Sequence, residues 1–221
     1  MSYRWFLCLP ALMLAAPAAA QLSNGTSGYS SAPREGVEAE YWSLLDQLGP
    51  CLANQKPDQA AAFVGADIGS SAESAAFDVL FNVGRNRRNN CLGRFSGLYG
   101  AQRAHLRGSV AEGLFEKLPD ETLNAFLANP PTAPETVATL HDFARCYVVA
   151  HPAAARDLLR RTDISSEGEL QFIRQIAADF APCLPEGRDV QLNPTSVRMA
   201  IAEAAWRAAT GRPTPKMQAS N

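Results

Sequence analysis

The chain lacks the short motifs that accompany the best-known enzyme chemistries. Gly-x-Ser-x-Gly, His-Glu-x-x-His, Ser-x-x-Lys, a glycine-rich phosphate loop and an EF-hand loop are all missing. A close Cys-x-x-Cys pair, which redox catalysis would need, is missing as well. These absences argue against motif-bearing hydrolases and kinases. We therefore assign no catalytic residue, no cofactor, no cofactor-binding residue and no metal ligand.

Excess charge of one sign and long apolar runs are also missing. Lysine and arginine total 20 against 22 acidic residues, a net charge of −2, which excludes a wholly basic nucleic-acid binder, and we expect no nucleic-acid partner. After residue 20 no stretch is apolar enough to span a bilayer, so we expect a chain that is not membrane-embedded. No sustained alternation of β-branched residues predicts a strand. A hydrophobic content of 47% still allows a sizeable helical core.

Residues 1–20 have the layout of a cleaved secretory signal. Arg4 precedes an apolar stretch, Pro17 ends it, and three alanines stand before Gln21. The apolar stretch is shorter than the roughly 20 residues that span a bilayer, although an uncleaved anchor is the alternative. The sequence therefore predicts a periplasmic or secreted protein that begins at Gln21.

The organisation of the remaining chain is that of an internal repeat. Four blocks recur in the same order with only small drift in their offsets. Cys51 and Pro57 match Cys146 and Pro152, Ser70 and Glu73 match Ser166 and Glu169, Cys91 and Leu92 match Cys183 and Leu184, and the block from Arg107 to Glu112 matches the block from Arg198 to Glu203. We interpret this pattern as a duplicated unit.

Each unit is predicted to contain about four helices. Prolines 57 and 152 suit the first turn of the second helix, and Ser70 and Ser166 each begin a capping box for the third. Gly49 and Pro50 should kink or end the first helix. We predict an all-α fold of two tandem disulfide-stapled units, helical-repeat or bundle-like. Its segments are a flexible stretch (21–40), unit 1 (41–118), a connecting helix and Pro-rich linker (119–135), unit 2 (136–210) and a flexible tail (211–221).

The cysteine count agrees with export. Cys8 leaves with the signal, and Cys51, Cys91, Cys146 and Cys183 remain, an even number in a compartment that permits disulfides. All three possible pairings respect the repeat. If one unit folded alone before duplication, its two cysteines had to pair with each other. This argument predicts structural disulfides Cys51–Cys91 and Cys146–Cys183.

The most specific pattern of charged residues is the Arg-x-x-x-Ala-Glu block, which occurs once in each unit. Positions i and i+5 lie about 140° apart on a helix, so Arg107 cannot pair with Glu112, nor Arg198 with Glu203. We interpret all four as structural charge pairs that tie the fourth helix of each unit to neighbouring helices and to orphan carbonyls at helix ends. The alternative is a pair of equivalent ligand sites. Glu203 can also pair with Arg207 at i+4.

Unit 1 carries a concentration of arginine that unit 2 lacks. Residues 79–111 contain no acid and six arginines, and the first unit has about four extra residues before Cys91. A helix C-terminus favours cations, which is one explanation. The other is an anion-binding patch formed by Arg85, Arg87, Arg88, Arg94 and Arg103.

The histidines do not form a metal site in this reading. His141, Cys146 and His151 are spaced by five residues, so their side chains point in different directions from one helix. His105 on the fourth helix has no recognisable nucleophile beside it. We expect it to be a surface or boundary residue.

Three features carry a resemblance to other proteins: the export signal, the Cys and Pro near the start of each unit, and the pattern Arg-x-x-[Val/Ile]-Ala-Glu-x-x-[Phe/Trp] near the end of each unit. Through these features the chain resembles a group of uncharacterised exported helical tandem-repeat proteins of Gram-negative bacteria. The resemblance covers most of residues 41–210 and implies an envelope or secreted setting with no known activity. We expect a non-catalytic binding or scaffolding protein with an unknown protein or anionic envelope partner. The alternative is a hydrolase or transferase acting on an anionic envelope component in a cleft between the units. A deep pocket lined by Glu112 or Glu203 would favour that alternative.

Overall fold

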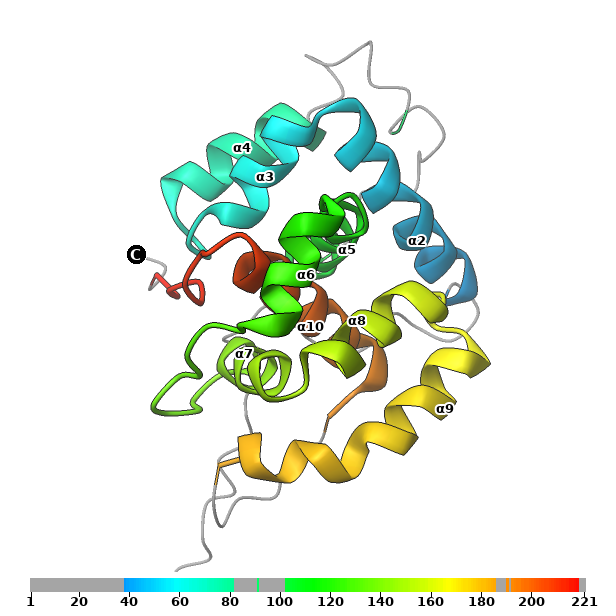
Figure 1. The fold of residues 1–221 in the computed structure, drawn as a ribbon. Helices are drawn as coiled ribbons and strands as arrows, with labels where there is room; N and C mark the ends of the chain where they lie inside the picture. The colour runs from blue at the N-terminus through cyan, green and yellow to red at the C-terminus, as the bar shows by residue number, and fades with distance from the viewer. Residues whose placement is uncertain (1–37, 82–90, 92–101, 186–189, 191, 219–221) are drawn as a thin grey trace, which may run out of the picture.

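The computed structural model describes residues 38–81, 91, 102–185, 190 and 192–218 (Figure 1). Within these ranges the secondary structure is helical, apart from one isolated bridge between Ile68 and Met217. The all-α prediction is therefore confirmed. Residues 1–37, which hold the predicted signal and most of the predicted flexible stretch, lie outside the described residues. Among the residues described, no helix is long and apolar enough to cross a membrane.

Nine α-helices and one 3-10 helix follow one another in the described ranges. They are α2 (Glu38–Gln55), α3 (Pro57–Gly65), α4 (Ser71–Phe81), α5 (Arg103–Glu116), α6 (Asp120–Ala128), α7 (Leu140–Ala150), α8 (Pro152–Arg161), α9 (Glu167–Ile176), η2 (Ala177–Cys183) and α10 (Pro194–Ala209).

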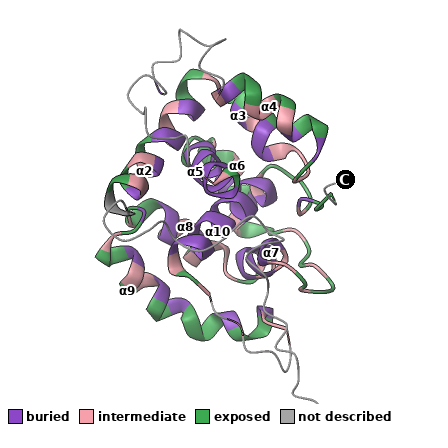
Figure 2. Cartoon of the chain, turned by 180° about the vertical axis from the view of Figure 1, so that it is seen from behind, coloured by how far each residue is buried: buried purple, intermediate pink, exposed green. Residues whose placement is uncertain are grey.

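Helices α5 and α10 form the centre of the molecule. Residues 104–115 of α5 and 195–208 of α10 are all buried, and the two helices pack against each other. Helix α2 covers α5, and helix α7 covers α10. Figure 2 shows α5 and α10 buried along most of their length, whereas the outer helices are buried on one side only. Any charged residue on the two central helices must therefore find its partner inside the protein.

Glycines let the central helices approach closely. A Cβ added at Gly113 of α5 would lie 2.4 Å from the carbonyl carbon of Gly49 in α2. The same addition at Gly108 would lie 2.4 Å from Cβ of Met199 in α10. Helix α2 does not end at Pro50 but continues to Gln55, which excludes one of the two predicted outcomes, an end of the helix, and leaves the other, a kink, as a prediction. Close packing against α5 outweighs the roughly 3 kcal/mol penalty of an interior proline.

The third helix of each predicted unit starts with the same cap. At α4, the Ser70 hydroxyl accepts a hydrogen bond from the Glu73 amide at 3.0 Å, and the Glu73 carboxylate accepts one from the Gly69 amide at 2.8 Å. At α9, Ser166 and Glu169 repeat both bonds, at 3.0 and 2.7 Å. The predicted serine caps are confirmed. Each carboxylate reaches one residue further back than in a standard capping box.

Two disulfides join α2 to Cys91 and α7 to the 3-10 helix η2. Cys51 is bonded to Cys91 and Cys146 to Cys183, with S–S distances of 2.06 and 2.01 Å. The pairing agrees with the one predicted from the sequence. The bridges close loops with sequence separations of 40 and 37 residues. Structural disulfides of this kind indicate an oxidising compartment outside the cytoplasm.

The C-terminal segment differs from the prediction of a flexible tail. The amide of Ile68 donates to the carbonyl of Lys216, and the amide of Gln218 donates to the carbonyl of Ile68, both at 2.9 Å. Asp67 accepts a further bond from the Lys216 amide. Up to Gln218 the segment therefore lies against the connection between α3 and α4, where Figure 1 shows the red end of the chain. Main-chain hydrogen bonds, which leave no side-chain signature in the sequence, explain the difference.

Candidate functional site

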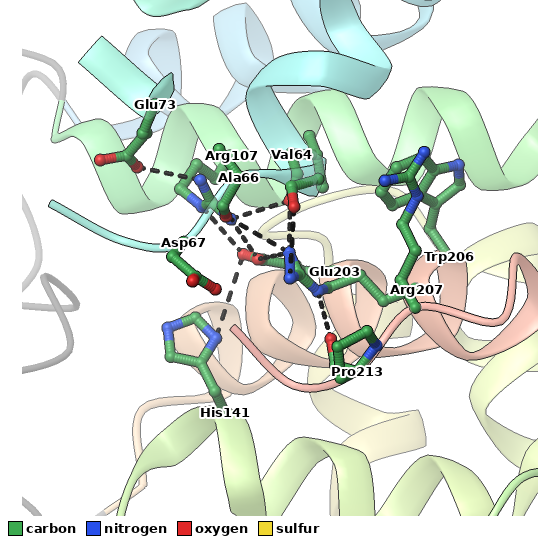
Figure 3. Close-up of polar contacts among 12 residues, drawn as sticks. Val64, Ala66, Asp67, Glu73, Arg107, His141, Glu203, Trp206, Arg207 and Pro213 are labelled. Carbon is green, nitrogen blue, oxygen red and sulfur yellow. Dashed lines mark hydrogen bonds and ion pairs between the residues drawn. The ribbon is translucent and has the colours of Figure 1, made fainter. Parts of the chain in front are cut away.

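The strongest cluster of charged side chains lies where α5 crosses α10. Arg107 of α5 donates from Nε and Nη2 to the two carboxylate oxygens of Glu203 of α10, at 3.2 and 2.5 Å (Figure 3). Arg107 is only 1% exposed and Glu203 is fully buried. A buried, bidentate ion pair of this kind fixes the relative position of the two helices.

The remaining donors of Arg107 reach the C-terminal end of α3. Its guanidinium donates to the carbonyls of Phe63 and Val64 at 2.9 Å and to the carbonyl of Ala66 at 3.1 Å. It also donates to the Glu73 carboxylate at 2.9 Å. Helix-end carbonyls have no partner within their own helix, so the arginine satisfies groups that would otherwise be buried without hydrogen bonds.

Arg198 of α10 makes the corresponding contacts in the other half of the chain. Its Nε donates to Glu112 of α5 at 3.0 Å, and its Nη2 pairs with the second oxygen of the same carboxylate. Its other donors reach the carbonyls of Leu158 and Thr162 at the end of α8, at 3.2 and 2.6 Å. The Glu169 carboxylate lies 3.8 Å away.

Each repeated arginine thus pairs with the glutamate of the opposite central helix. The sequence correctly excluded a pair within one block and predicted contacts with helix-end carbonyls. It did not predict that Arg107 would meet Glu203, or that Arg198 would meet Glu112. All four side chains are buried, so none of them offers an open surface to a ligand.

Glu203 is surrounded by positive charge. Besides Arg107, Arg207 lies 3.6 Å away and Nδ1 of His141 lies 4.0 Å away. Burial alone would raise the pKa of Glu203, but Arg107, His141 and Arg207 together hold that pKa below its usual value. The carboxylate is therefore ionised at neutral pH. The i+4 contact with Arg207 is the one predicted from the sequence.

Glu112 has acidic neighbours instead. Burial raises the pKa of Glu112 to about 7, against the opposing effect of Arg198. Glu116 and Asp46 raise the pKa further by repulsion. In the alignment of the two units, Asp46 stands where unit 2 has His141, and Glu116 stands where it has Arg207. The same buried pair is thus placed in opposite electrostatic surroundings.

A small pocket opens beside Glu203. It is lined by His141, Arg145, Glu203, Ala204, Arg207, Thr214 and Pro215, and its volume of about 10 Å³ is the space of one water molecule. Arg145 donates to the carbonyl of Arg212 at 3.1 Å, and Arg207 donates to the carbonyl of Pro213 at 2.7 Å. The C-terminal segment thereby closes the pocket, which has no room for a metabolite.

His105 contradicts the prediction of a surface or boundary residue, since it is only 1% exposed. Its Nδ1 lies 2.8 Å from the Tyr41 hydroxyl, and its ring packs 4.9 Å from that of Trp42. Burial lowers the pKa of His105 to about 4, so the ring is neutral and accepts the tyrosine hydrogen bond. Polar residues on every side of α5 concealed the burial of this helix.

The sequence predicts no metal ligand among His141, Cys146 and His151. Cys146 is bonded to Cys183, and in the described part of the chain no three His, Cys, Asp or Glu side chains are placed to hold a metal ion.

Most of the predicted anion-binding patch lies outside the described residues. This applies to Arg85, Arg87, Arg88 and Arg94. Arg103 is described and is exposed as the first residue of α5. It lies 3.6 Å from the Glu73 carboxylate and 4.4 Å above the Phe77 ring. The patch as a whole stays a prediction.

An open groove between α6 and α8 escaped the sequence analysis. It encloses about 450 Å³ and is lined by Asp120, Leu123, Asn124, Leu127, Arg156, Asp157, Arg160 and Arg161. Asp157 pairs with Arg156 at 2.6 Å and with Arg161 at 3.4 Å. Arg160 is exposed and forms no salt bridge among the described residues, but its positive charge lowers the pKa of Glu116, which burial raises. The groove joins a helix of the predicted linker to a helix of unit 2, so no single segment of sequence indicates it.

Comparison of the chain with protein-family models, with curated proteins and with solved structures found no match.

Proposed function

We propose that this protein is an exported, non-catalytic binding or scaffolding protein that docks a partner protein in the groove between α6 and α8. The observation that carries the proposal is the distribution of its arginines. Those on the central helices are engaged inside the fold, whereas Arg156, Arg160 and Arg161 line an open groove. Two disulfides and the signal-like residues 1–20 support a periplasmic or secreted location.

The chemistry of the groove favours a protein partner over a uniform polyanion. Asp120 and Asp157 stand among the three arginines, and the half-buried Leu127 supplies apolar surface, whereas Leu123 is buried beneath the groove. Such mixed surfaces, rich in arginine, are typical of protein interfaces. Arg160 is exposed and interacts with Glu116 through its charge without forming a salt bridge, so an acidic side chain of the partner can approach it from the solvent side.

Tandem duplication fits a scaffolding role. The exchange of Arg–Glu pairs between α5 and α10 is the pattern expected where two equivalent units meet about a twofold axis. An interface of this kind, with a disulfide on each side, supports a rigid body on which a partner can dock.

The enzymatic alternative has less support. A hydrolase or transferase would need room for a substrate beside Glu112 or Glu203. The pocket beside Glu203 holds about one water molecule. Both carboxylates are engaged by arginines.

Site-specific photo-cross-linking tests the docking proposal in cells that export the protein. A photoreactive residue at Asn124, in the groove, should give an adduct of discrete mass, whereas one at Gln175, on the exposed side of α9, should not. The substitution Arg160→Glu should abolish the adduct, and Arg174→Glu on α9 serves as the matched control. Equal adducts from both positions, or an adduct unaffected by Arg160→Glu, would refute the groove as the docking surface.

The export part of the proposal has its own test. Intact mass of protein recovered from the cell envelope or medium should correspond to a chain that begins at Gln21 and contains two disulfides. A chain that retains residues 1–20 would contradict export through a cleaved signal.

A further inference from the structure

Arg145 of α7 is a buried arginine without an acidic partner. It is only 8% exposed, and its hydrogen bond is to the carbonyl of Arg212 at 3.1 Å. None of the ion pairs among the described residues includes it, and burial lowers its pKa with no carboxylate opposing the effect. An uncompensated buried charge is costly, so the site calls for a counter-ion.

The guanidinium of Arg145 lines the same small pocket as Arg207 and His141. Thr214 and Pro215 close the pocket from the side of the C-terminal segment. Its volume of about 10 Å³ matches one water-sized particle. The pocket therefore admits a water molecule or a single small ion, but no phosphate or carboxylate ligand.

Among the described residues, the charges around the pocket leave a positive excess. Glu203, the one acid that lines it, is already shared by Arg107 and Arg207, with His141 beside it. The other nearby acids are also engaged: Glu73 pairs with Arg107, and Asp67 accepts from the Lys216 amide. The cations around them are Arg107, Arg145, Arg207 and Arg212, of which Arg212 lies over the Trp206 ring. Figure 3 shows Arg107, Arg207 and His141 converging on Glu203.

We propose that this pocket binds one monatomic anion of chloride size, held by Arg145 beneath residues 212–215. Arg207 contributes positive charge to the same pocket, while its guanidinium donates to the carbonyls of Val64, Gly65 and Pro213. The anion neutralises the positive charge that the described carboxylates leave uncompensated. A water molecule could fill the same space but could not neutralise Arg145. The site stabilises the seated C-terminal segment, because Arg145 also donates to the carbonyl of Arg212.

Thermal unfolding in matched salts tests the proposal. We expect the melting temperature of the full chain to rise by about 3 °C when sodium gluconate is replaced by 0.2 M sodium chloride at constant ionic strength, since a ligand that binds only the folded state raises its stability. Gluconate is too large for the pocket. An equal melting temperature in both salts would overturn the proposal.

A matched pair of variants locates the effect. Arg145→Gln keeps a donor for the Arg212 carbonyl and removes the charge, so the chloride response should disappear. Arg156→Gln, which removes an arginine of the open groove, should keep the full response. A response that survives Arg145→Gln would place the anion elsewhere and refute this site.

Bromide scattering gives a direct readout that needs no variant. In crystals of the unmodified protein grown with sodium bromide, an anomalous peak should lie within hydrogen-bond distance of the Arg145 guanidinium. Density for water alone at that position, with no anomalous signal, would refute the assignment even if Arg145→Gln failed to fold.

Discussion

Glu112 of α5 and Glu203 of α10 each receive two guanidinium hydrogen bonds from an arginine on the other's helix. The central helices are therefore tied together twice, by the same chemistry in both directions. The two pairs differ in their neighbours, because cations surround Glu203 while acids stand near Glu112. The first pair should mainly stabilise the fold, and the second should also make stability depend on pH.

Replacing Glu203 by glutamine should destabilise the protein strongly. The change leaves the charges of Arg107 and Arg207 buried with less compensation, and removing one partner of a buried ion pair costs about 3 kcal/mol or more. For a chain of this size we expect the melting temperature to fall by about 6–12 °C, measured by circular dichroism. Glu135→Gln, at an exposed position of the linker, should change it by no more than about 2 °C. Similar effects of both substitutions would mean that the buried pair adds little.

The raised pKa of Glu112 makes stability fall as pH rises. A carboxyl whose pKa is about 7 in the folded state and near 4.5 otherwise binds its proton more tightly when folded. The stabilising contribution of Glu112 to the free energy of unfolding is therefore fully present below pH 4.5 and is lost as pH rises through 7. Besides Asp46 and Glu116, the charged group that faces it is Arg198, which also lies 3.8 Å from Glu169. Thermal unfolding between pH 5 and 8 at constant ionic strength should show this decline.

His105 makes stability fall as pH is lowered, which is the opposite of the pH dependence expected from Glu112. Its pKa of about 4 lies below the usual 6.5, so the stability that depends on the neutral ring is lost as pH falls from 6.5 towards 4. The alkaline decline must therefore be isolated with variants. Glu116→Gln removes an exposed acid near Glu112 and should raise the melting temperature by about 2–4 °C at pH 8, with a smaller effect at pH 5. Equal effects at both pH values would contradict the role assigned to Glu112.

The features that the sequence predicted correctly have local signals. Ser70 and Ser166 begin capping boxes that can be read within four residues. The disulfides followed from an even cysteine count and from the argument that each unit once folded alone. Proline at the first turn of α3 and α8 has a similarly local cause.

The features that the sequence missed depend on tertiary packing. The i, i+5 spacing excluded Arg107 as a partner of Glu112, but only the crossing of α5 and α10 brings it to Glu203. His105 was misplaced because α5 is buried on every side, which its polar pattern does not indicate. The groove beside Arg160 arises where α6 lies next to α8.

Replacing a glycine at a helix crossing should destabilise the protein, and an exposed glycine elsewhere in the chain provides the control. Gly113→Ala would place a Cβ 2.4 Å from the backbone of α2, so the helices must separate, at a cost of about 3 kcal/mol and about 6–12 °C in melting temperature. Gly168→Ala, in the exposed first turn of α9, meets no atom closer than 3.6 Å. There alanine should leave the melting temperature unchanged or raise it slightly. Tolerance of both substitutions would mean that α2 and α5 pack less tightly than the structure indicates.

Truncation after Gly211 should destabilise the protein through lost main-chain contacts. The shortened chain loses the bonds between Ile68 and the segment around Met217, and it takes the carbonyl acceptors away from Arg145 and Arg207. Allowing about 1 kcal/mol for each lost bond, less the entropy regained by the free chain, we expect about 2–3 kcal/mol and a melting temperature about 5–10 °C lower.

Lys216→Ala separates this effect from any effect of the lysine side chain, because it keeps the backbone bonds of an exposed residue and should leave stability unchanged. Hydrogen exchange gives a local readout. The amide of Ile68 donates to the Lys216 carbonyl, so it should be protected in the full chain and in Lys216→Ala, but should exchange rapidly after truncation. Equal protection in all three proteins would show that the C-terminal segment is not held against Ile68 in solution, and that it behaves as the flexible tail its composition first indicated.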